Sequence, residues 1–141
     1  MNLYAESSAV LAWLLGEKDG ARAYAELTAA ELVVSSDLTV LECERALLRF
    51  RISGEVTEGV IADRQAALSG ASAGWHILHL IEEVLDRARL PFPAEPVRTM
   101  DAIHLASALV ARSVIPGLAL LSLDRRIRSN GRRLGFKVLP R

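Results

Sequence analysis

Short, nearly continuous apolar runs alternate with longer amphipathic stretches along the chain. The apolar runs have the length of buried strands, and most of them end in serine, proline or acidic residues. Strands are predicted at 2–5, 32–36, 75–80, 118–123 and 136–140. Helices are predicted at 7–16, 19–31, 37–53, 57–70, 81–90, 99–113 and 124–135. This alternation indicates an α/β fold, a three-layer α/β/α sandwich with a central, mostly parallel sheet.

Residues near the ends of these elements support the predicted boundaries. A serine at the start of the first helix and Thr99 are candidate N-caps, and Gly54 stands where the helix at 37–53 should stop. Three prolines within 91–96 exclude a helix there and indicate an extended turn.

Length and composition narrow the class of protein. The 141 residues suffice for one domain with a substantial core, so we expect a single domain at 1–141. Hydrophobic residues make up 51% of the chain and the mean hydropathy is +0.25, which predicts apolar surface for a partner or a second copy.

Cys43 is the only cysteine, so we expect a reducing, cytoplasmic compartment. Arg112 and Pro116 interrupt the apolar region 102–123, so no membrane span is predicted.

Charge is distributed unevenly, although the formal net charge is zero. Residues 1–123 hold 10 basic and 16 acidic side chains, whereas residues 124–141 hold 7 basic side chains and one acidic one, Asp124. An acidic body beside a basic segment predicts an acidic site next to a surface that binds a polyanion. The alternative is that the basic segment is simply the solvated face of a helix.

Four acidic residues fall at the ends of predicted strands or in the first turns of the following helices. Glu6 follows the first strand, Asp124 ends the fourth, and Glu42 and Asp101 lie near helix starts. In a parallel sheet, the carboxyl ends of the strands form the edge that binds ligands. Carboxylates gathered there repel one another unless a cation neutralises them, and oxygen ligands favour Mg²⁺ or Mn²⁺. The pattern predicts a metal site that activates water at a phosphoryl group.

Each acid also has a purely structural interpretation. Asp124 is a candidate N-cap, the helix dipole favours Asp101, and Glu42 can pair with arginines of its own helix. Glu6 fits a capping role least, because the neighbouring serines are better caps than glutamate. His104 lies one helical turn after Asp101, where it could support the acids of the site, but a lone histidine in a helix is more often a structural residue.

Four segments together resemble a known family and cover nearly the whole chain. They are LYAESSAVLAWLL, SSDLTVLECERALLR, TMDAIHLASAL and LLSLDRRIRSNGRRLGFKVL. Their acids, hydroxyl residues and basic helix are similar to those of the PIN-domain ribonucleases, in particular the VapC-type toxins of bacterial toxin–antitoxin pairs. The resemblance implies a PIN-like fold and Mg²⁺- or Mn²⁺-dependent endonucleolytic hydrolysis of RNA phosphodiester bonds.

The resemblance also implies a catalytic role for each of the four acids. Glu6, Asp101 and Asp124 stand at metal-binding positions. Glu42 stands where the family has a glutamate, and we expect it to orient or deprotonate the attacking water. Position 6 departs from the family pattern, which usually has aspartate there. The alternative function is therefore a catalytically weak or inactive PIN-like module that binds RNA or protein.

Further residues and partners follow from the same resemblance. Ser8 and Ser122 match hydroxyl positions that support the site. Arg125, Arg126 and Arg128 follow the fourth acid and are expected to bind RNA phosphates. A cognate antitoxin and a homodimer are the expected protein partners.

Two other classes of protein, a signalling domain and a hydrolase, fit the sequence poorly. A phosphoacceptor signalling domain needs a lysine near a late strand and an aspartate that ends a central strand, but the strand at 32–36 ends in serines and the only lysines are Lys18 and Lys137. A serine hydrolase needs a nucleophile elbow, and Ser7 and Ser8 lack its glycine pattern.

Overall fold

The carboxyl ends of all five strands meet at one edge, because the central sheet is wholly parallel. The computed structural model describes residues 1–141, and its strand order is β3-β2-β1-β4-β5. The strands are β1 (Asn2–Ala5), β2 (Leu32–Ser36), β3 (His76–Leu78), β4 (Ala119–Leu121) and β5 (Val138–Leu139). Strand β1 is central, since Leu3 pairs with Val33 of β2 on one side and with Ala119 of β4 on the other. The strand order reverses between β1 and β4, where open parallel sheets bind their ligands.

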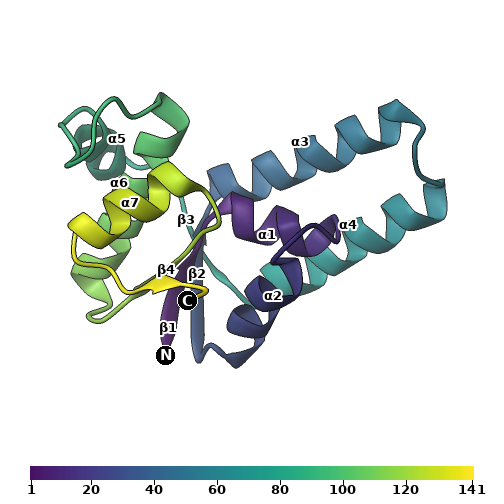
Figure 1. The fold of residues 1–141 in the computed structure, drawn as a ribbon, viewed down its shortest axis with the longest axis horizontal. Coiled ribbons are helices and arrows are strands. Elements are labelled where there is room, and N and C mark those ends of the chain that lie inside the picture. The colour runs from purple at the N-terminus through teal and green to yellow at the C-terminus, as the bar shows by residue number, and fades with distance from the viewer.

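Seven helices cover the sheet in two layers, as Figure 1 shows. They are α1 (Ser7–Leu14), α2 (Gly20–Ala29), α3 (Asp37–Ser53), α4 (Glu58–Ser72), α5 (Glu82–Ala88), α6 (Thr99–Val114) and α7 (Arg125–Arg133). Helices α1 to α4 contribute to the core on one face, and α5 to α7 contribute to the core on the other. The predicted three-layer α/β/α fold is confirmed.

Side chains of the central strand alternate between these two cores. Leu3 and Ala5 pack against the α1–α4 layer, whereas Tyr4 packs against the α5–α7 layer, and all three are buried. Burying a side chain the size of leucine contributes about 1.5–3 kcal/mol. This anchoring on both faces fixes where β1 ends, and therefore where Glu6 stands.

Helix α7 packs unusually closely on β4. A Cβ atom at Gly131 would lie 2.5 Å from Cδ2 of the buried Leu120, so any larger residue here would force this side chain to move. The same helix begins directly after Asp124. Its close packing therefore holds the start of α7 beside the end of β4.

The sequence predicts the order of the elements and most helix boundaries, but the structure corrects some details. Helix α3 spans 37–53 as expected, and Gly54 follows it in the left-handed conformation with φ of 71°. Thr99 is not an N-cap: Arg98 occupies that position without a side-chain hydrogen bond, and Thr99 is the first helical residue. The strands expected at 75–80, 118–123 and 136–140 are all shorter, since β3 and β4 hold three residues each and β5 holds two. None of the helices has the length and apolar character needed to span a membrane.

Candidate active site at the carboxyl edge of the sheet

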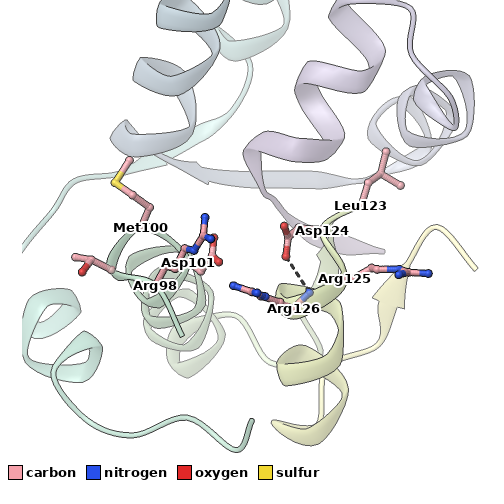
Figure 2. A pocket seen from close by; sticks show the side chains of 8 residues that line it. Arg98, Met100, Asp101, Leu123, Asp124, Arg125 and Arg126 are labelled. Carbon is pink, nitrogen blue, oxygen red and sulfur yellow. Dashed lines mark hydrogen bonds between the residues drawn. The ribbon is translucent and has the colours of Figure 1, made fainter. Parts of the chain in front are cut away.

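A cavity of about 600 Å³ opens at the carboxyl edge, beside the ends of β4 and the starts of α6 and α7. Figure 2 shows Asp101 and Asp124 at this cavity, on α6 and immediately before α7 respectively. The residues that line it are Arg98, Thr99, Met100, Asp101, Leu123, Asp124, Arg125 and Arg126. Two acids and three arginines therefore share one concave surface, at the edge where the sheet topology predicts a ligand site.

Asp124 combines a structural and a site position. Its Oδ1 atom accepts hydrogen bonds from the backbone N–H groups of Arg126 and Ile127, both at 2.9 Å, so it is the N-cap of α7. The capping interpretation is thus correct for this residue. It does not use up the carboxylate, because Oδ2 accepts no hydrogen bond from the protein. The Asp124 carboxylate thus caps α7 with one oxygen and lines the cavity, where its other oxygen can bind a ligand.

The pKa of Asp101 is raised by its surroundings. Partial burial raises the pKa of its carboxyl group, and the negative charges of Asp124, Glu6 and Glu42 raise this pKa further, while His104 opposes them. The aspartate therefore lies among like charges. Clusters of this kind are common at functional sites and favour the binding of a cation.

Glu6 lies below the cavity, and only 3% of its surface is exposed. Its Oε1 atom accepts hydrogen bonds from the Ser7 hydroxyl at 2.8 Å and from the Ser8 N–H at 3.1 Å. Its Oε2 atom accepts hydrogen bonds from the Ser122 hydroxyl at 2.7 Å and from the Ser8 hydroxyl. Glu6, and not a serine, is the N-cap of α1. The expectation that glutamate would not cap this helix is wrong, because the strand end aims its carboxylate at the first helical turn.

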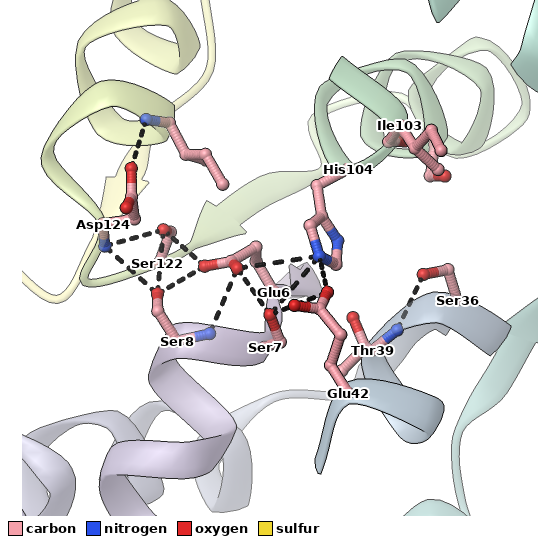
Figure 3. A network of polar contacts seen from close by, with 12 residues as sticks. Glu6, Ser7, Ser8, Ser36, Thr39, Glu42, Ile103, His104, Ser122 and Asp124 are labelled. Atoms are coloured by element: carbon pink, nitrogen blue, oxygen red, sulfur yellow. Dashed lines mark hydrogen bonds and ion pairs between the residues drawn. The ribbon is translucent and has the colours of Figure 1, made fainter. Parts of the chain in front are cut away.

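Ser8 and Ser122 connect Glu6 to the opposite side of the site, as Figure 3 shows. Ser8 Oγ accepts hydrogen bonds from the N–H groups of Leu123 at 2.9 Å and Asp124 at 3.1 Å. Ser122 Oγ also accepts from the Asp124 N–H, at 3.1 Å. Both hydroxyls expected to support the site therefore lie between Glu6 and the backbone of Asp124.

A second polar cluster joins α1, α3 and α6 beside Glu6 (Figure 3). His104 Nε2 lies 2.5 Å from Oε1 of Glu42, and the Ser7 hydroxyl lies 3.3 Å from each of them. Burial lowers the pKa of His104, but the hydrogen bond to Glu42 and the negative charges of Glu6, Glu42 and Asp101 outweigh it, so the pKa is raised. The sequence favours a structural role for His104, with support of the site as the alternative. The structure gives it contacts with Glu42 and Ser7 beside Glu6, one helical turn after Asp101.

The arginines divide into two groups. Arg98, Arg125 and Arg126 line the cavity. Arg128 does not: its guanidinium donates to the carbonyl oxygens of Ser122 at 2.6 Å, Leu139 at 3.0 Å and Pro140 at 2.9 Å. Arg128 therefore ties α7 to the last strand, and its contact with RNA stays a prediction.

The four acids do not gather as closely as the sequence predicts. No group of three or more histidine, cysteine, aspartate or glutamate side chains lies close enough together to hold a metal ion. Asp101 and Asp124 share the cavity, Glu6 lies beneath it, and Glu42 pairs with His104 to one side. The structure thus brings two of the four carboxylates to one open surface.

Comparisons with known proteins agree with this fold. The PIN domain family model matches residues 3–132. Ribonuclease VapC45 of Mycobacterium tuberculosis strain CDC 1551 and ribonuclease VapC49 of strain H37Rv are each 29% identical over 138 residues, covering 98% of this chain and 94% of theirs.

Two solved structures are similar in fold. One is M. tuberculosis VapC20, a sarcin-ricin loop cleaving toxin, with a TM-score of 0.66, 15% identity and coverage of 98% of this chain and 99% of that one. The other is FitAB bound to an IR36 DNA fragment, with a TM-score of 0.62, 16% identity and coverage of 99% and 94%. The family model spans all four acids and both supporting serines, and the chain belongs to the PIN-domain family.

Proposed function

We propose that this protein is a metal-dependent endoribonuclease that hydrolyses RNA phosphodiester bonds and acts as the toxin of a bacterial toxin–antitoxin pair. The observation that carries the proposal is the pairing of Asp101 and Asp124 across an arginine-lined cavity at the switch point of the sheet. The VapC ribonucleases that match nearly the full chain support the same activity.

The cavity carboxylates fit a hard divalent cation. Mg²⁺ usually keeps several waters and binds proteins through one or two carboxylates together with substrate phosphate. Asp101 and Asp124 supply two such carboxylates, and the pKa of Asp101 is raised by burial and by neighbouring negative charge that a cation would neutralise. When bound, Mg²⁺ or Mn²⁺ would lower the pKa of its water and stabilise charge on the scissile phosphate. The resemblance adds Glu6 to this set, although its carboxylate is buried and hydrogen-bonded.

The protein's own groups would position the RNA and the attacking water. Arg98, Arg125 and Arg126 line the cavity and would bind phosphates flanking the scissile bond, with an affinity that falls as salt rises. Glu42 keeps about 30% of its side chain exposed, and we assign it the role of orienting or deprotonating the attacking water. His104 fixes the Glu42 carboxylate from the buried side.

A cognate antitoxin and a second copy of the chain are the proposed protein partners, in the cytoplasm. Apolar surface is available for them on the α1–α4 layer. A hollow of about 400 Å³ there is lined mainly by apolar residues and includes Trp13, Tyr24 and Trp75. Trp13 and Tyr24 stack with ring centroids 4.7 Å apart.

Cleavage of total RNA, with the cut sites mapped, tests the proposed activity. We expect cuts with Mg²⁺ or Mn²⁺, no cuts with EDTA, and at least a hundredfold slower cleavage by Asp101→Asn. Asp63→Asn is the matched control, because Asp63 is an exposed acid of α4 away from the cavity. An inactive RNA-binding module would instead bind RNA in a salt-dependent way without cutting it. Unchanged cleavage by Asp101→Asn would contradict the assignment of this residue.

A further inference from the structure

The carboxylate of Glu6 has no acceptor site left for a cation. An ionised carboxylate has about four lone-pair positions. Four donors occupy them in this chain: the Ser7 and Ser8 hydroxyls, the Ser8 N–H and the Ser122 hydroxyl. The side chain is almost completely buried. A metal ion at Glu6 would have to displace at least one of these hydrogen bonds in an enclosed space.

Two of those donors, Ser8 and Ser122, also hydrogen-bond the backbone near Asp124 and so link Glu6 to it. A serine hydroxyl has one proton and two acceptor positions. Ser8 and Ser122 give that proton to Oε2 of Glu6, which leaves their lone pairs for backbone N–H groups. Those N–H groups belong to Leu123 and Asp124, at 2.9–3.1 Å. The charged acceptor strengthens these linked hydrogen bonds, because hydrogen bonds to an ion polarise their neighbours.

We propose that Glu6 is a positioning residue, which holds Asp124 at the cavity through Ser8 and Ser122, and is not itself a ligand of the divalent ion. The inference rests on the proposed function, since it concerns the same metal site. It departs from the role that the family resemblance implies for position 6. The longer glutamate side chain supplies the reach, because one carboxylate caps α1 and contacts Ser122 at the end of β4.

The metal-free protein gives the first test, and it needs neither RNA nor activity. With EDTA present, we expect Glu6→Gln to lower the Tm, because an amide cannot accept all four hydrogen bonds. We expect Asp101→Asn to raise the Tm, because it removes a charge that lies among like charges. Amide hydrogen exchange followed by NMR should accelerate at least tenfold at Leu123 and Asp124 in Glu6→Gln. A Glu6→Gln variant with a raised Tm and unchanged exchange at both amides would overturn the proposal.

Binding of Mn²⁺ alone, measured by calorimetry, gives the second test. Asp101→Asn should weaken Mn²⁺ binding at least tenfold, whereas Glu6→Gln should weaken it less than threefold. Equal losses in the two variants, with unchanged amide exchange at Leu123 and Asp124 in Glu6→Gln, would identify Glu6 as a ligand and overturn the proposal. Equal losses with accelerated exchange at both amides would instead show that Asp124 is displaced when Glu6 is lost, as the proposal requires. If no variant binds Mn²⁺ and the parent does not either, the proposed metal site fails while the amide-exchange result still decides the positioning role.

Ser122→Ala keeps the test decisive if Glu6→Gln does not fold. It removes one of the two hydroxyls that link Glu6 to Asp124. Exchange at the Asp124 amide should accelerate, and kcat for RNA cleavage should fall about tenfold with KM within twofold, because the cavity arginines are untouched. Ser69→Ala, on the exposed face of α4, is the control. Unchanged exchange and kcat in Ser122→Ala would overturn the proposal.

Discussion

His104 Nε2 and Glu42 Oε1 lie 2.5 Å apart and join α6 to α3 below the carboxyl edge of the sheet. The imidazole is buried, with 2% of its side chain exposed, whereas the Glu42 side chain is 30% exposed. Oε1 of Glu6 lies 3.8 Å from the same nitrogen. One buried ring thus faces two carboxylates from different elements, which fixes the inner side of Glu42 and leaves the rest of it accessible.

Replacing His104 should therefore affect both stability and catalysis. His104→Ala leaves a cavity and removes the hydrogen-bond partner of Glu42, so we expect a loss of about 2–4 kcal/mol in the free energy of unfolding. His104→Gln can still donate to Glu42 and should recover part of this loss. Urea unfolding and single-turnover RNA cleavage measure the two effects. Cleavage by folded His104→Ala at the parental rate would show that Glu42 does not need this contact.

Two substitutions of Asp124 distinguish its role as the N-cap of α7 from its role in RNA cleavage. Asp124→Asn retains an oxygen for the N–H groups of Arg126 and Ile127, so helix α7 should keep its N-cap and the Tm should stay within about 2 °C. Asp124→Ala loses the cap and should cost about 0.5–2 kcal/mol. Both should slow RNA cleavage at least tenfold. Normal cleavage by Asp124→Asn would limit Asp124 to its capping role.

The strand and helix pattern was predictable because it is set by local sequence. Strand β1, helix α3 and the stop at Gly54 all follow from apolar runs, helical periodicity and helix-end chemistry. The grouping of Asp101 with Asp124 was predictable as well, because parallel strands bring their carboxyl ends to one edge.

Side-chain direction at the site was not predictable in the same way. Whether Glu6 points into the cavity or turns back to cap α1 depends on Ser122, which is 116 residues away in the chain. Arg128 lies in a basic run that suggests a solvated face, yet its guanidinium finds three carbonyl oxygens at the last strand. His104 joins the site only because α3 brings Glu42 beside it. These contacts are tertiary, so local patterns carry no signal for them.

The two groups of arginines should respond differently to substitution. Arg126→Gln removes a charge that lines the cavity, so RNA binding should weaken, and the slope of log K against log salt should become shallower by about 0.7. Its Tm should not change. Arg128→Gln should instead lower the Tm, because three carbonyl oxygens lose their donor. Salt-dependent RNA binding and thermal unfolding of both variants check this. A larger binding defect in Arg128→Gln at unchanged Tm would instead support the predicted contact of Arg128 with RNA.

The free energy of unfolding should fall at alkaline pH because Cys43 is buried. Burial, together with the charges of Glu42, Glu6 and Glu44, raises the pKa of its thiol to about 12 from an ordinary value of 9.0. The thiol therefore ionises more readily in the unfolded chain, so its contribution to stability is complete below pH 9 and is lost as the pH rises from 9 to 12. At pH 10.5 the loss should reach about 2 kcal/mol, at roughly 1.4 kcal/mol per pH unit.

The variant Cys43→Ala lacks this titration and provides the comparison. At pH 7.5 it should be less stable than the parent by about 1 kcal/mol, because a buried sulfur atom is removed. Between pH 7.5 and 10.5 its free energy of unfolding should fall less than that of the parent, so the two curves converge or cross. The buried Tyr4, with its pKa raised to about 12, is present in both proteins and cancels in the comparison. Urea unfolding at the two pH values decides the matter, and parallel losses in both proteins would show that the thiol does not titrate differently in the two states.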